Sequence, residues 1–120
     1  MRLTEVDFGA AQPIEGYGPG FFRLGGAVHE GALVIAPGHV ATWGGYDDAA
    51  ALLELAGQID VLLIGTGAEI APLPAPLRRE LEGAGLGVEN MASPAACRTY
   101  NVLLSEGRRV AVALLPVQAG

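Results

Sequence analysis

Two short apolar runs constrain the fold of this chain more than any other feature. They are residues 61–64 and 110–115, and each follows a segment whose apolar residues recur at helical spacing. Continuous apolar runs of this length are typical of strands covered on both faces. Residues 86–91 form a third predicted strand between them. Alternation of helices and strands over residues 47–120 favours an α/β fold with a central mixed, mostly parallel sheet.

The clearest helix signals lie directly before the last strand. Ser93 is a typical N-cap residue, Pro94 suits the first helical position, and Gly107 suits the left-handed conformation that ends helices. The helical spacing predicts one apolar face formed by Ala96, Cys97, Tyr100, Leu103 and Leu104. The opposite face carries the polar residues Arg98, Asn101 and Ser105.

Two further helices are predicted earlier in this half. The first begins at Asp47 or Asp48 and ends at Gly57. The second follows a proline-rich link, and its apolar positions are Leu73, Leu77, Leu81 and Ala84. Both helices precede a predicted strand, which completes the alternation.

The first half of the chain predicts β-structure of a different kind. Residues 3–8 are a candidate first strand, residues 12–20 are predicted to be a loop rich in Gly and Pro, and residues 21–37 an antiparallel ribbon. Gly25-Gly26 between apolar runs is a hairpin signal. A length of 120 residues allows one core. We therefore expect a single domain over residues 1–120, with ribbon and loops over 1–46 and alternating elements over 47–120.

Composition excludes several classes of function. A net charge of −6 argues against a nucleic-acid surface, which needs a basic stripe. No run approaches the ~20 apolar residues of a membrane span. The N-terminus, MRLTEVDFGA, has no apolar core of a signal peptide, and one cysteine cannot form an internal disulfide. All seven basic residues are arginine, which indicates a GC-rich bacterial genome. These features predict a bacterial cytoplasmic protein.

One candidate ligand site combines two strand ends. The strand at 61–64 runs into Gly65-Thr66-Gly67, and the strand at 86–91 runs into Ser93 at the helix start. In open α/β sheets, ligands gather beyond the carboxyl ends of the strands, and helix N-termini attract anions. The predicted site for an anionic small molecule therefore comprises Gly65, Thr66, Gly67, Ser93, Cys97 and Arg98. The alternative is that GTG is only a tight turn, because it matches neither a P-loop nor the dinucleotide-binding glycine pattern.

Catalytic and metal-binding patterns are weak. Cys97 lies near a helix start, where a thiol is acidified, but a nucleophilic cysteine needs a base, and only His29 and His39 could supply one. A buried structural cysteine is the commoner case. The histidines, cysteine and acids show no metal-ligand spacing. We therefore assign no catalytic residue, no metal and no cofactor.

Four pieces of the sequence together resemble a known family. They are GYGPGFFRLGG, VIAPGHVATW, LLIGTG and AACRTYNVLLSEGRRVAVALL, in that order along the chain. The set resembles the domain shared by respiratory complex I assembly factor 3 and the adipogenesis-associated Mth-type domain protein. The resemblance implies a layered α/β fold with a central mixed sheet, and it gives weight to the segment from Arg98 to Asn101.

Two hypotheses of function follow. The first, implied by the resemblance, is a non-enzymatic assembly or interaction module that aids biogenesis of a respiratory membrane complex. Its predicted partner surface comprises Trp43, Arg98 and Asn101. This hypothesis allows self-association and a peripheral place at the inner membrane through a partner. The alternative is a small-ligand-binding protein or enzyme with its site at Gly65-Thr66-Gly67 and the Ser93 helix start.

Overall fold

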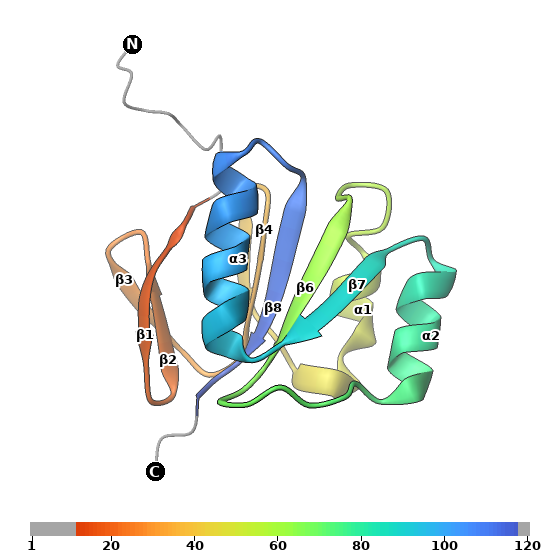
Figure 1. Ribbon diagram of the computed structural model, residues 1–120, viewed down its shortest axis with the longest axis horizontal. Coiled ribbons are helices and arrows are strands. Elements are labelled where there is room, and N and C mark those ends of the chain that lie inside the picture. Colours follow the sequence, from red (N-terminus) through yellow and green to blue (C-terminus); the bar gives the residue numbers. More distant parts are fainter. Residues whose placement is uncertain (1–11, 118–120) are drawn as a thin grey trace.

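A five-stranded sheet forms the centre of the molecule (Figure 1), whose computed structural model describes residues 12–117. Its strand order is β5-β4-β8-β6-β7. The pairs β8–β6 and β6–β7 are parallel, whereas β4 pairs antiparallel with both β5 and β8. The strands are β4 (Leu33–Ala36), β5 (His39–Thr42), β6 (Val61–Thr66), β7 (Gly87–Met91) and β8 (Val110–Leu115). The predicted α/β fold with a mixed central sheet is confirmed.

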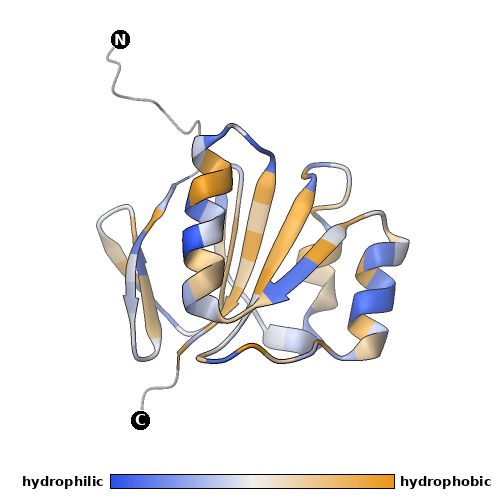
Figure 2. Ribbon diagram, viewed as in Figure 1, coloured by the Kyte–Doolittle hydropathy of each residue, from blue (hydrophilic) through white to orange (hydrophobic). Residues whose placement is uncertain are grey.

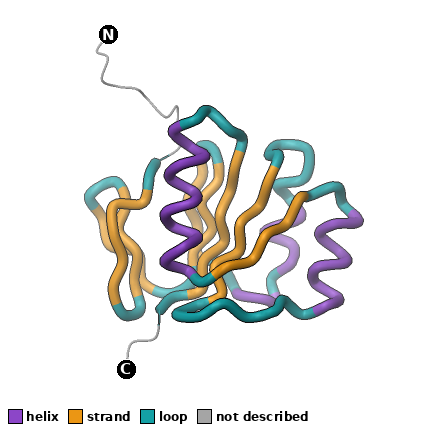
Figure 3. The backbone as a smooth tube through the Cα atoms, viewed as in Figure 1, coloured by secondary structure: helices purple, strands orange, loops and turns teal. Residues whose placement is uncertain are grey.

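The helices cover both faces of this sheet (Figure 3). They are α1 (Ala49–Leu53), α2 (Ala75–Gly83) and α3 (Ser93–Ser105), with a short 3₁₀ turn, η1 (Gly45–Asp47), before α1. The chain crosses from β6 outward to β7 through α2, and then back past β6 to β8 through α3. Because parallel crossovers are right-handed, these opposite directions place α2 and α3 on opposite faces.

Strand β8 shows how one strand serves two cores. Val110, Val112 and Leu114 pack on the side of α3, and Ala111 and Ala113 pack on the side of α1 and α2. All five side chains are at most 1% exposed. Successive side chains of a strand point to opposite faces, so a continuous apolar run fits a strand with cover on both sides. Figure 2 shows the same apolar strands between more polar helices.

A second, three-stranded antiparallel sheet lies beside α3 on one face of the molecule. It comprises β1 (Ile14–Gly18), β2 (Phe21–Leu24) and β3 (Ala27–Glu30), in that order. The Gly25-Gly26 turn joins β2 and β3, and both glycines have positive φ (62° and 78°), as a two-residue hairpin turn requires. Phe22 and Leu24 reach from this sheet into the α3 core. The predicted ribbon is therefore present.

Three expectations for the first half need correction or fall outside the structure. The predicted loop at 12–20 is wrong over β1, since pairing with β2 stabilises a strand despite its two glycines. The segment 33–36 was predicted within the ribbon, but it forms β4 of the central sheet because its side chains are buried on both faces. The strand predicted at 3–8 lies outside the described residues.

Helix ends follow the sequence signals at two positions. Asp48 caps α1, accepting a hydrogen bond from the Ala51 N–H. At the end of α3, Gly107 has a φ of 78°, and the N–H groups of Gly107 and Arg108 donate to the carbonyls of Leu104 and Leu103, both at 3.0 Å. This bond pair is a Schellman motif. It turns the chain directly into β8.

Candidate functional site

The predicted site residues divide between two places along the first half of α3. Gly65, Thr66, Gly67 and Ser93 meet at the carboxyl ends of β6 and β7, here called the Ser93 junction. Cys97, Arg98 and Asn101 line a cavity between α3 and β1, here called the β1–α3 cavity. The structure therefore does not unite the six predicted ligand-binding residues in one site.

The Ser93 junction is closed by hydrogen bonds within the chain. The Ser93 hydroxyl donates to the Leu115 carbonyl at 2.6 Å and accepts the Gly67 N–H at 2.9 Å. The Ser93 N–H donates to the Gly67 carbonyl at 2.7 Å. Ser93 is 0% exposed. The predicted N-cap role is wrong, because Ala92 is the N-cap residue and the Ser93 side chain instead joins three segments of the chain.

The remaining polar side chain of the junction is engaged in the same way. The Thr66 hydroxyl lies 2.7 Å from the Glu69 carbonyl and 3.2 Å from the Met91 carbonyl, and it accepts the Ala71 N–H at 3.1 Å. Gly65 lies so close to α3 that an added Cβ would lie 2.7 Å from the Ser93 Oγ. The crevice that usually binds ligands in such sheets is thus occupied by the start of α3 itself.

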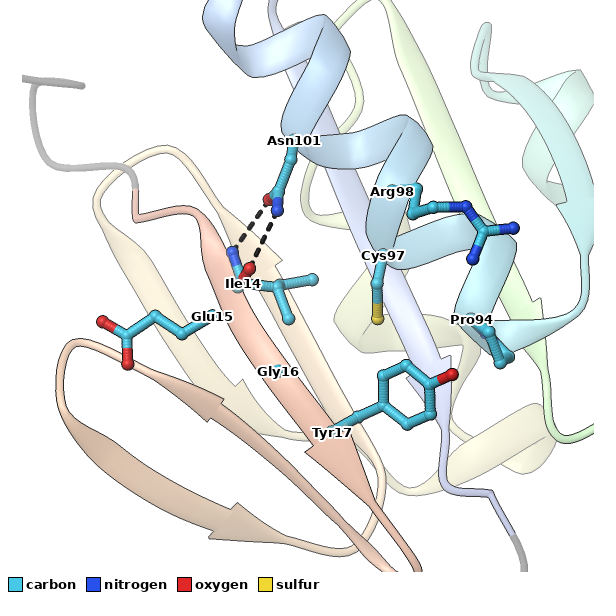
Figure 4. Close-up of a pocket in the computed structure, with 8 residues that line it drawn as sticks. All are labelled: Ile14, Glu15, Gly16, Tyr17, Pro94, Cys97, Arg98 and Asn101. Atoms are coloured by element: carbon cyan, nitrogen blue, oxygen red, sulfur yellow. Dashed lines mark hydrogen bonds between the residues drawn. The ribbon is translucent and has the colours of Figure 1, made fainter.

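The β1–α3 cavity, in contrast, is open and has a volume of about 250 Å³. Figure 4 shows its two walls, one from β1 and one from the first two turns of α3. The lining residues are Ile14, Glu15, Gly16, Tyr17, Pro94, Cys97, Arg98 and Asn101. Most of this lining is apolar or weakly polar, and the charged side chains of Arg98 and Glu15 lie at its edges.

Asn101 holds the two walls together at one end of the cavity. Its amide oxygen accepts the Ile14 N–H at 2.8 Å, and its amide nitrogen donates to the Ile14 carbonyl at 2.8 Å. The side chain thus pairs with the outer edge of β1 as a neighbouring strand would. This contact crosses 87 residues of sequence. Asn101 is therefore part of the packing between α3 and β1, although its helical position predicted a solvent-facing side chain.

Cys97 forms the floor of the cavity. Its sulfur points toward β1 and the ring of Tyr17 (Figure 4), and the residue is 5% exposed. Burial raises the pKa of the Cys97 thiol to about 11, and the nearby Arg98 charge only partly opposes this shift. The thiol is therefore protonated at neutral pH. His29 lies on β3 and His39 on β5, and neither lines this cavity. Neither histidine is therefore placed to activate Cys97 as a base.

The charged residues lie at the rim. Arg98 is exposed, and Figure 4 shows its side chain leaving α3 on the side away from β1. It has no ion-pair partner among residues 12–117. Glu15 points away from the cavity, and its carboxylate accepts the Gly26 N–H at 3.2 Å. Arg98 is therefore an exposed charge at the edge of the cavity, directed away from β1.

Trp43 is separated from this surface. It is 5% exposed and belongs to the core on the side of α1 and α2. Its indole N–H donates to the Asp48 carbonyl at 3.2 Å, and its ring packs edge-on against Tyr46, with centroids 6.1 Å apart. The predicted partner residues Trp43, Arg98 and Asn101 thus do not lie on one face of the molecule.

The β1 side of the cavity was not predicted from the sequence to be part of a site. Its four lining residues, Ile14, Glu15, Gly16 and Tyr17, fall in the segment predicted to be a loop. Tyr17 is 44% exposed even though it lines the cavity. An aromatic residue between two glycines was the one local signal, since glycine within a strand often marks a close approach of another group.

The fold defines the class of protein, a layered Mth938-like α/β domain. The Bordetella pertussis protein solved as a Mth938-like domain superposes with a TM-score of 0.77 and 33% identity, over 98% of this chain and 94% of that chain. A crystal structure of an outer membrane protein from Bartonella henselae gives a TM-score of 0.83 and 38% identity, over 92% of this chain and 99% of the other.

The chain belongs to the family described as a protein of unknown function (DUF498/DUF598), whose model matches residues 14–115. An uncharacterised protein of Rhodobacter capsulatus is 58% identical over 98% of this chain and 94% of its own length. The NADH dehydrogenase [ubiquinone] 1 alpha subcomplex assembly factor 3 of Danio rerio is 34% identical, over 100% of this chain and 73% of that protein. The resemblance inferred from the sequence is thus confirmed.

Proposed function

We propose that this protein is a non-enzymatic interaction module that takes part in the biogenesis of a respiratory membrane complex. The observation that carries the proposal is the match of the whole chain, at 34% identity, to the complex I assembly factor 3 of Danio rerio. The human protein of the same name is 28% identical over the whole of this chain. The match covers both β1 and α3, which form the β1–α3 cavity.

The geometry supports an interaction role more than a catalytic one. The Cys97 thiol is held protonated, and the hydroxyls of Ser93 and Thr66 are bound within the chain. The β1–α3 cavity instead presents an apolar floor and an exposed guanidinium, which are features of protein interfaces. Within residues 12–117, the longest helix, α3, has only 13 residues, and no helix is suited to cross a membrane.

The test is removal of the gene from a source organism that assembles complex I. We expect a lower level of the assembled complex on native gels and a proportionate loss of NADH–quinone activity in isolated membranes. Re-expression of the unaltered chain should restore both. A normal level and activity in the deletion strain would remove the proposal.

A tagged chain supplies the second measurement. Purified with and without membranes and read by mass spectrometry, it should enrich respiratory-complex subunits over an unrelated tagged protein of similar charge. Enrichment that does not depend on membranes would indicate contact before membrane insertion. Equal recovery from the tagged chain and the control would contradict a role in complex assembly.

A ligand-binding role is the second candidate, and Cys97 and Arg98 are the residues that favour it, since both line the β1–α3 cavity. An apolar site with an arginine at its rim suits a small amphipathic anion. Metabolite binding at this cavity should raise the melting temperature, and Arg98→Ala should remove that shift. Unchanged stabilisation in Arg98→Ala would exclude Arg98 from such a site.

A further inference from the structure

We propose that the β1–α3 cavity is an anchor pocket for one aromatic side chain of a partner protein, with a partner carboxylate next to that residue binding Arg98. This inference rests on the proposed function and names the chemistry of the partner segment. It follows from the size of the cavity, the nature of its lining and the position of Arg98 at its rim.

The size of the cavity favours a single side chain over a whole metabolite. Its volume is about 250 Å³. A cavity of about 150 Å³ already holds a benzene molecule, whereas small-molecule sites usually measure roughly 300–1,000 Å³. One aromatic ring with its linking carbons therefore fills this space. Such a buried aromatic anchor is the feature that most often dominates the energy of a protein interface.

The lining favours an aromatic ring over a polar group. The floor is the protonated thiol of Cys97, and the walls include the side chains of Ile14, Pro94 and Tyr17. Sulfur at the edge of an aromatic ring is a favourable contact, and ring pairs prefer the edge-to-face and offset geometries that a side wall allows. Asn101 already binds both backbone groups of Ile14 through its amide, so only its second N–H and second oxygen lone pair remain for a polar ligand group.

Arg98 at the rim of the cavity indicates which residue should stand next to the aromatic anchor in the partner. The Arg98 guanidinium is exposed and has no ion pair within residues 12–117, while Glu15 points away and is bound to the Gly26 N–H. Arginine pairs with carboxylates through two parallel bonds and also stacks on aromatic rings. The net charge of −6 of the whole chain disfavours a long acidic segment. We therefore expect one Asp or Glu close to the aromatic anchor.

The outer face of α3 extends the contact by one turn. Val102 lies four residues after Arg98 and is 54% exposed. Residues four apart on a helix are neighbours on its surface. A partner segment that fills the cavity and binds Arg98 would also cover Val102. This contact would remove the apolar side chain of Val102 from water and so favour binding.

Two small probes test the chemistry of the pocket directly. 3-Phenylpropanoate and 2-phenylethylammonium carry the same ring and opposite charges, and each is titrated into the ¹⁵N-labelled chain by NMR. We expect amide shifts confined to residues 14–17 and 94–101, with the anion bound up to about fivefold more tightly at low salt. Equal affinity of the two probes, or shifts elsewhere on the surface, would overturn the proposal.

Variants separate the ring from the charge. Arg98→Gln should equalise the two affinities while the ring still binds, and Arg79→Gln on α2, also at an exposed position, should change neither. Cys97→Leu fills the floor and should abolish binding of both probes. If that variant does not fold, the contrast between Arg98→Gln and Arg79→Gln still decides the role of the rim charge.

The partner itself is identified by cross-linking. p-Benzoylphenylalanine in place of Val102 is activated by light in the source organism, and the linked peptide is sequenced. We expect a peptide with an aromatic residue within two positions of Asp or Glu. A peptide without this pair, a second copy of this chain or a lipid would contradict the inference. A further outcome is that deletion of the gene lowers the level of complex I while the Cys97→Leu and Arg98→Gln variants both restore it fully. That result would contradict the anchor pocket but leave the proposed function intact.

Discussion

The Ser93 junction and the β1–α3 cavity both use the start of α3, yet they differ in what their polar groups do. At the junction, the hydroxyls of Ser93 and Thr66 bind the backbone of neighbouring strands and loops. At the cavity, Asn101 and Glu15 also bind backbone groups, whereas Arg98 points outward and the Cys97 thiol lines the cavity floor. Placement at a strand end thus does not distinguish a ligand site from a packing site. The two are distinguished by whether the side chains are accessible and whether their hydrogen-bonding groups are still free.

The largest expected effect is at the closest backbone contact of the junction. In Gly65→Ala, the new Cβ would lie 2.7 Å from the Ser93 Oγ and 2.9 Å from the Ser93 Cα. Because a helix backbone cannot move away cheaply, we expect a loss of about 3 kcal/mol in the free energy of unfolding. Urea unfolding measures it. Gly16→Ala at the cavity is the matched control, since its Cβ would meet nothing within 4 Å. Equal losses of stability in Gly65→Ala and Gly16→Ala would contradict the contrast between a closed junction and an open cavity.

The second prediction concerns the Ser93 hydroxyl. Ser93→Ala leaves the Gly67 N–H and the Leu115 carbonyl without their partner in a buried setting. Each unsatisfied buried group costs about 1–3 kcal/mol, so we expect a destabilisation of about 2–3 kcal/mol in thermal or urea unfolding. The control is Ser105→Ala, whose exposed hydroxyl bonds only within the last turn of α3. A loss of less than about 1 kcal/mol in the free energy of unfolding of Ser93→Ala would show that the Ser93 hydrogen bonds are not needed to keep the junction closed.

The third prediction concerns the contact that closes one end of the cavity. Asn101→Ala removes both bonds to Ile14, and because these groups are only partly buried, water can replace them. We expect a loss of about 1 kcal/mol and faster hydrogen exchange of the Ile14 amide. The Ser93 N–H, bonded to Gly67, should keep its protection. Unchanged exchange at Ile14 would indicate that β1 is held by its pairing with β2 alone.

The smallest effect at neutral pH is expected at a buried polar atom with no partner. The Tyr100 hydroxyl is fully buried and makes no hydrogen bond among the described residues. Tyr100→Phe therefore loses no bond and should change the free energy of unfolding by less than about 1 kcal/mol, with stabilisation as the expected direction. A larger loss in the free energy of unfolding would show that this hydroxyl has a hydrogen-bond partner, as the hydroxyls of the Ser93 junction do.

The same residue also predicts a pH dependence. Burial raises the pKa of Tyr100 from 10.0 to about 12 and that of Cys97 from 9.0 to about 11. The folded chain therefore keeps these protons at a pH where the unfolded chain loses them. Stability is fully present below pH 9 and falls as the pH rises toward 12, by at most about 1.4 kcal/mol per pH unit and group. Unfolding curves of Tyr100→Phe should show a shallower fall above pH 10.

Much of the architecture was predictable because local signals and the tertiary structure agree. The run at 110–115 predicted a strand with two covered faces, and β8 is that strand. Gly107 predicted the end of α3, and its positive φ and Schellman bonds match. Asp48 predicted a helix start and caps α1. In each case the signal depends on a few neighbouring residues and needs no distant partner.

The site was less predictable because it depends on distant contacts. The segment of β1 has two glycines and follows a proline, so nothing local distinguishes it from a loop, and only pairing with β2 makes it a strand. Ser93 has the chemistry of an N-cap, but the approach of Gly67 and Leu115 gives its hydroxyl better partners. Trp43 has the composition of an interface residue, but α1 covers it.

The sequence by itself determined the α/β class, the order of the elements in the second half, the end of α3 at Gly107 and the family, because periodicity, helix-stop chemistry and ordered motifs are local properties. Only the tertiary structure decided that Ser93 closes the crevice at the strand ends while Cys97 and Arg98 line an open cavity. Both outcomes depend on how α3 docks between β1 and β8. That docking is set by side-chain packing across residues as far apart as Ile14 and Asn101.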